Sequence, residues 1–155
     1  MALPNFNEYG QLPAGLHEAS LGEVLSRFGQ DSETRKGQAD LLQQIVEAAV
    51  SYSTMKRVLV WGSFVTTKPE PNDLDYSVVV SNNHFWSNVT DAHRRFFFPF
   101  DARIHYGVDP GYLVVPDFPL ARYVELVDFM GWTRDNLPCG IVEISLHGET
   151  TSEAI

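Results

Sequence analysis

Apolar residues recur at helical spacing in four stretches of the chain, and the clearest is 32–52. Its apolar positions form one stripe, which predicts an amphipathic helix packed on a core. The stripe consists of Leu41, Leu42, Ile45, Val46, Ala49 and Val50. A shorter helix is expected over 20–28, because a Ser-x-x-Glu capping box opens it and a glycine follows it. Further helices are predicted at 85–97 and 119–132.

Short apolar runs rich in β-branched and aromatic residues predict strands. They cover 56–61, 74–80, 103–108, 112–115 and 140–146, and the third and fourth could be one strand with a break. Between the first two, 63–67 is expected to form a helical turn and 68–72 a loop that holds two prolines. Helices alternating with strands predict an α/β (α+β) fold with a central mixed sheet flanked by helices.

The 155 residues are predicted to form one domain, 1–155, with an extended lead-in at 1–19 and a frayed tail at 148–155. No run of about 18 apolar residues predicts a membrane span, and the N-terminus lacks the pattern of a secretory signal. The single Cys139 excludes an intramolecular disulfide and fits a reducing compartment. We therefore expect a cytoplasmic protein without a membrane partner.

The net charge of −9 is unevenly distributed along the chain. Residues 1–55 carry 3 basic and 7 acidic side chains, 56–106 carry 6 and 5, and 107–155 carry 2 and 8. The overall negative charge argues against broad, sequence-independent binding of nucleic acid. The middle segment alone is not acidic, as expected if it accepts a polyanion, although chance clustering explains the pattern equally well.

Chemistry-bearing residues lie where the first two central strands meet their loop. Gly62-Ser63 ends one strand, and Asp73-Leu74-Asp75 opens the next. Two aspartates one residue apart on a strand point to the same face, where a cation would relieve their repulsion. Carboxylates suit a hard divalent ion, and a Gly-Ser turn can present N–H groups to a phosphate. The pattern predicts a site for a metal–nucleotide complex.

The run from Gly62 to Asp75, with nine residues between Gly-Ser and Asp-x-Asp, resembles the signature of the polymerase-beta-like nucleotidyltransferase superfamily. Together with Leu12-Pro13-Ala14-Gly15-Leu16-His17 and Gly140-Ile141-Val142-Glu143-Ile144, it is similar to a group of small, uncharacterised nucleotidyltransferase-like bacterial proteins. The resemblance covers most of the chain. Its flanking motifs say nothing about substrate.

The resemblance implies transfer of a nucleotidyl group from an NTP to a hydroxyl of a protein, an RNA or a small molecule, with Mg²⁺ or Mn²⁺. It gives Asp73 and Asp75 the metal and the catalytic role. Gly62 and Ser63 would hold the β- and γ-phosphates, and Lys68 in the motif loop could reach a phosphate, although a solvated loop lysine is the simpler interpretation.

Superfamily enzymes usually take a third carboxylate from a later strand. Asp109 is the first candidate for this catalytic and metal-binding role, Asp101 is the rival, and the absence of a third acid stays open. A turn-forming role at Pro110 competes for Asp109. Without a third acid, transfer activity becomes doubtful.

Two further interpretations remain beside the enzyme. Small members of the superfamily often act with a helical partner protein, some as antitoxins in toxin–antitoxin pairs, so a protein partner or a homodimer is expected. A catalytically inactive domain that binds a nucleotide or a partner is the alternative, and a pure scaffold is the third.

A basic island, Arg94, Arg95, Arg103 and His105, could contact a triphosphate or an acidic partner, or form a solvated helix end.

Overall fold

The computed structural model describes residues 3–114 and 139–147 and contains helices and strands in alternation. The helices are α1 (Leu21–Phe28), α2 (Glu33–Val50), α3 (Arg94–Phe97) and α4 (Pro99–Tyr106), with short 3₁₀ turns η1 (Gly62–Val65), η2 (Asn83–Asn88) and η3 (Asp91–His93). The strands are β1 (Gly15–Glu18), β2 (Met55–Trp61), β3 (Asp75–Val80), β4 (Gly111–Val114) and β5 (Gly140–Ser145). No helix in the described ranges is long and apolar enough to span a membrane.

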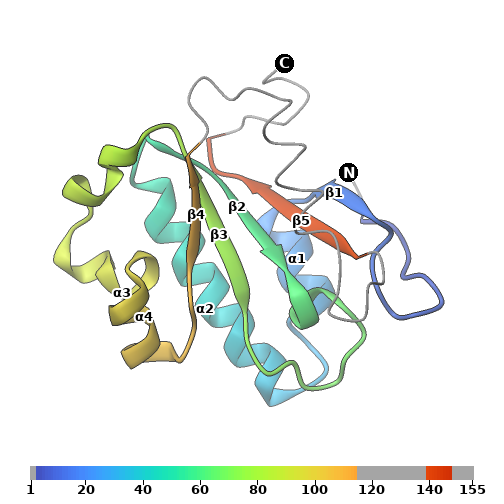
Figure 1. Ribbon diagram of the computed structural model, residues 1–155. Helices are drawn as coiled ribbons and strands as arrows, with labels where there is room; N and C mark the ends of the chain where they lie inside the picture. The colour runs from blue at the N-terminus through green and yellow to red at the C-terminus, as the bar shows by residue number, and fades with distance from the viewer. Residues whose placement is uncertain (1–2, 115–138, 148–155) are drawn as a thin grey trace.

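The strands form one mixed sheet in the order β1-β5-β2-β3-β4 (Figure 1). β2 runs antiparallel to both of its neighbours, while β1 is parallel to β5 and β4 is parallel to β3. The carboxyl end of β2 therefore lies beside the amino ends of the other four strands, at the same end of the sheet. The Gly-Ser turn and the first residues of β3 and β4 all lie at this end.

The described helices all pack on one face of the sheet (Figure 1). Val58, Tyr76 and Val142 of the central strands join α1–α4 in the main core there. The intervening strand residues point to the second face, where Leu59 and Val79 belong to a smaller apolar cluster. The expected α/β fold with a mixed central sheet is confirmed.

Several predicted elements are confirmed by the structure. The helices expected at 20–28 and 32–52 are α1 and α2, whose N-cap residues Ser20 and Ser32 each accept a hydrogen bond from a main-chain N–H of the first turn. The second half of the expected capping box does not form, because the Glu23 carboxylate accepts from the N–H of Leu3 instead (2.5 Å). The strands expected at 56–61, 74–80 and 140–146 are β2, β3 and β5.

Three predictions about elements were wrong. The lead-in at 1–19 also supplies the edge strand β1, paired with β5 from the far end of the chain. Residues 103–106 form the end of helix α4 instead of a strand, because Pro99 starts a helix there and Gly107, at φ 67°, caps it in the left-handed conformation. The helix expected at 85–97 is broken into η2, η3 and α3. The helix expected at 119–132 and the tail at 148–155 lie outside the described residues.

Candidate functional site

Gly62 and the Asp75 carboxylate lie directly against each other at the edge where β2 ends. Trp61 and Asp75 are the last register pair between β2 and β3, so the two chains separate just beyond it. Gly62 has φ 75°, a conformation that disfavours any side chain. A Cβ at this position would overlap Oδ2 of Asp75. Only glycine therefore lets the carboxylate approach the Gly-Ser turn this closely.

Asp75 points to the face of the sheet opposite the described helices. Its neighbours Leu74 and Tyr76 are both buried in the main core on the helix side, and strand side chains alternate. Asp73 is exposed and precedes β3 instead of lying within it, so the prediction that both aspartates sit on the strand was wrong. The loop expected at 68–72 extends to Leu74, so Asp73 lies near its end and before β3.

The loop that follows the Gly-Ser turn is held by its own hydrogen bonds. η1 contains Gly62 and Ser63, and the carbonyl of Ser63 accepts from the hydroxyl (2.7 Å) and the N–H (3.2 Å) of Thr66. The N–H of Thr67 donates to the carbonyl of Gly10 (3.0 Å), which ties the loop to the N-terminal segment. Thr66 Oγ1 also accepts from the N–H of Lys68 (3.2 Å). The predicted helical turn is confirmed as this short 3₁₀ segment.

Arg35, in the first turn of α2, donates hydrogen bonds to residues 64–68 of this loop. It is 4% exposed, and its guanidinium donates to main-chain carbonyls only. Nη1 donates to Phe64 (2.7 Å) and Phe28 (3.0 Å), Nη2 to Thr66 (2.7 Å) and Lys68 (2.5 Å), and Nε also to Lys68 (3.2 Å). Burial lowers the pKa of Arg35, and the nearby negative charge of Asp31 opposes this shift.

The sequence interpretation missed Arg35, although a signal was present. Arg35 lies four residues before Ala39 and seven before Leu42, so it continues the buried stripe of α2 by one more turn. A basic residue on the apolar face of a helix must find acceptors inside the protein. Here three of the four acceptors are carbonyls of residues 64–68, which follow the Gly-Ser turn, and the fourth is the carbonyl of Phe28.

The two candidates for a third carboxylate are both paired with arginines. Asp109 is exposed and accepts from Nε (3.0 Å) and Nη2 (2.5 Å) of Arg103. Asp101 lies on α4, 3.7 Å from Nη2 of Arg94. Asp109 stands two residues before Gly111, just as Asp75 stands two before Ser77, and Gly111 pairs with Ser77. By this register Asp109 lies level with Asp75, beside the start of the neighbouring strand. Asp101, on α4, has no such position.

Two residues of the basic island, Arg94 and Arg103, make local contacts. Arg94 and Arg103 hold the two acids just described, and the guanidinium of Arg94 also lies 4.2 Å from the ring centre of Phe98.

A buried ion pair occupies the second face of the sheet. Nε of Arg57 lies 3.3 Å from Oε1 of Glu143, and both side chains are at most 1% exposed. Leu59 and Glu143 are register partners, so the pair lies further into the sheet than Asp75. Burial also raises the pKa of the Cys139 thiol, which disfavours the reactive thiolate.

The donors available for a divalent ion are few. Within residues 3–114 and 139–147, no group of three or more His, Cys, Asp or Glu side chains is placed to hold a metal. Mg²⁺ is commonly bound by one or two carboxylates, with phosphate oxygens and water completing its shell. Asp75 and Asp73 are at most two such carboxylates, so a Mg²⁺ ion held by them would need phosphate oxygens and water to complete its shell.

Comparison with known sequences gives one match, to a family of unknown function designated DUF6932, over residues 4–145. The chain belongs to this family. The match spans every described strand of this DUF6932 protein, including β1 and β5. No curated protein and no solved structure matches the chain.

Proposed function

We propose that this protein is a Mg²⁺-dependent nucleotidyltransferase that binds an NTP at the Gly62–Ser63 turn beside Asp75. The observation that carries the proposal is the apposition of Gly62 and the Asp75 carboxylate at the open end of β2. A phosphate approaching that turn would meet main-chain N–H groups and a carboxylate-bound cation together. The Lys68 ammonium is exposed and has no partner among the described residues, so it is available for the phosphates.

In the proposed reaction the acceptor oxygen bonds to the α-phosphorus of the NTP while the bond to the leaving pyrophosphate breaks. The acceptor's proton passes to a base. The metal would neutralise the phosphates and favour ionisation of the acceptor hydroxyl. Asp73 and Asp75 would hold it, and Ser63 would orient a phosphate oxygen. A partner protein or a second copy would supply acceptor recognition, and we propose a cytoplasmic setting, where NTPs are available.

A second candidate function is a nucleotide-binding or partner-binding domain without turnover. The Arg103–Asp109 pair favours it, because the guanidinium of Arg103 competes with a second metal for the Asp109 carboxylate. Binding and transfer are therefore tested separately.

Thermal unfolding with MgCl₂ and each of ATP, GTP, CTP and UTP tests binding. A ligand at 100 times its Kd adds about 2.7 kcal/mol, or roughly 5–10 °C in a domain of this size. We expect a shift that needs both metal and NTP and disappears in Asp75→Asn, but persists in Asp40→Asn, an exposed carboxylate on α2. No shift with any nucleotide would refute both the transferase and the nucleotide-binding domain, and leave only the partner-binding domain. Pyrophosphate release, with label from the α-phosphate on an acceptor, then separates the enzyme from the inactive domain.

A further inference from the structure

All five N–H donors of the Arg35 guanidinium are bonded to main-chain carbonyls. Five N–H groups meet the carbonyls of Phe28, Phe64, Thr66 and Lys68, and three of these carbonyls belong to the five residues 64–68. Arginine has five donors in a fixed planar fork, so such an arrangement sets the loop's shape as well as its position. A lysine, with one nitrogen, cannot reproduce it.

Lys68 is the residue that this arrangement fixes most tightly. Its carbonyl accepts from both Nε and Nη2 of Arg35, and its N–H donates to Thr66 Oγ1. Its side chain, by contrast, is exposed and unpaired among residues 3–114 and 139–147. A cation carried on immobilised main chain loses less conformational freedom when it binds an anion than one on a mobile loop.

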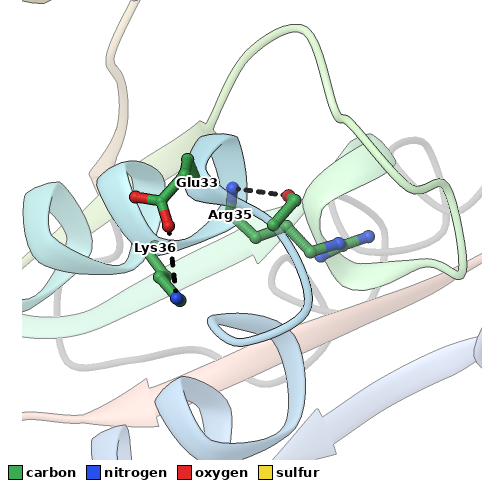
Figure 2. Close-up of polar contacts among 4 residues, drawn as sticks. Glu33, Arg35 and Lys36 are labelled. Atoms are coloured by element: carbon green, nitrogen blue, oxygen red, sulfur yellow. Dashed lines mark hydrogen bonds and ion pairs between the residues drawn. The ribbon is translucent and has the colours of Figure 1, made fainter.

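The neighbouring lysine on α2 shows the difference between a surface charge and this contact. Figure 2 shows Lys36 joined to Glu33, at 3.3 Å, on the exposed surface of the helix. The Arg35 side chain points away from that pair, toward the segment after β2 (Figure 2). Lys36 therefore offers a matched control, with the same helix turn and charge but no contact to the loop.

We infer that Arg35 is the positioning residue of the proposed nucleotide site, and that it acts by fixing Lys68 for contact with the phosphates. This inference rests on the proposed nucleotide binding. Arg35 itself touches no ligand, since its donors are all taken by carbonyls. Its contribution reaches the phosphates through the main chain of 64–68, so removing Lys68 should make Arg35 irrelevant to affinity.

A double-mutant cycle tests this dependence. The Kd of Mg²⁺ with ATP, GTP, CTP or UTP, and with tripolyphosphate as a base-free probe, is measured for the wild type, Arg35→Lys, Lys68→Met and the double variant. Each single change should weaken binding about tenfold, as losses of supporting contacts commonly do. The double variant should also lose about tenfold, because the two residues act as one unit. A loss near a hundredfold would mean independent action and overturn the inference, and Lys36→Met should bind like the wild type.

Hydrogen exchange of the ligand-free proteins supplies a readout that does not depend on the nucleotide. In Arg35→Lys the amides of 66–68 should exchange about tenfold faster, while those of β2 and β3 stay unchanged. Unchanged exchange in 66–68 overturns the inference even if the wild type binds NTP, as does faster exchange with unchanged affinity. A wild type that binds neither NTP nor tripolyphosphate refutes the proposed function and, with it, the role of Arg35. If Arg35→Lys does not fold, Thr66→Val frees the Lys68 N–H instead, and it must show the same non-additivity with Lys68→Met.

Discussion

Replacing Gly62 with alanine tests the contact that carries the proposed site. The substitution meets two penalties. A side chain at φ 75° costs about 1–2 kcal/mol, because the left-handed conformation crowds Cβ. The new methyl group would also overlap the Asp75 carboxylate, and relieving such overpacking costs about 1–3 kcal/mol more. The free energy of unfolding should therefore fall by about 2–5 kcal/mol.

Gly107 is the matched control for the conformational part of this penalty. It has φ 67°, but nothing lies within 4 Å of a Cβ built there. Gly107→Ala should consequently cost only the 1–2 kcal/mol or so of the left-handed backbone. Urea unfolding followed by circular dichroism measures both variants, and equal m-values show that the comparison concerns stability alone.

The double variant Gly62→Ala/Asp75→Ala isolates the crowding itself. Shortening residue 75 gives the methyl group room, so the double variant should recover about 1–3 kcal/mol relative to the sum of the single changes. The Asp75→Ala variant is measured separately, because the carboxylate makes other contacts. If Gly62→Ala costs no more than Gly107→Ala, the carboxylate does not lie against the Gly-Ser turn, and the argument for a shared metal–phosphate site fails.

Two other predictions concern the core. Glu143→Gln should lower the free energy of unfolding by about 3–5 kcal/mol, because it leaves Arg57 buried beside a neutral partner. In urea unfolding, Arg57→Met/Glu143→Leu should regain most of that loss. If the double variant is as unstable as Glu143→Gln, the prediction is wrong. Burial, and secondarily Tyr106, raises the pKa of the Tyr76 hydroxyl well above that of an exposed tyrosine, so the unfolded chain loses this proton at a lower pH than the folded protein does. Stability from Tyr76 is thus complete below about pH 10 and falls as the pH rises further, by up to about 1.4 kcal/mol per unit. Tyr76→Phe should flatten that slope above about pH 10, and an unchanged slope would contradict the assignment. At neutral pH the substitution should cost about 1 kcal/mol for the lost bond to the Phe96 carbonyl.

The local pattern of the chain was enough to predict most of the elements around the site. The stripe of α2, the apolar runs of β2 and β3 and the prolines of the motif loop each act through neighbours a few residues away. The prediction of a strand at 103–108 was wrong because it relied on the apolar residues and left out the helix signals on either side of them. Pro99 and Gly107 set the limits of a helix there, and the helix leaves Ile104 largely exposed.

The candidate site was predictable in its residue types but not in its contacts. The Gly-Ser turn follows β2, and Asp75 opens β3. Because these two strands pair as in a hairpin, their register brings Gly62 and Asp75 together. Asp109 meets Arg103 only six residues away, just beyond the end of α4, whereas the burial of Arg35 follows from segments that meet only in the folded chain.

The sequence by itself determined the mixed α/β character, the helix and strand periods and the grouping of Gly62 with Asp75, because these depend on short-range geometry. The tertiary structure alone decided that β1 joins β5 and that Arg35 holds the segment 64–68. The physical reason is the same in each case. A strand edge or a buried charge must be satisfied by whichever groups the fold brings to it, and sequence spacing does not specify those groups.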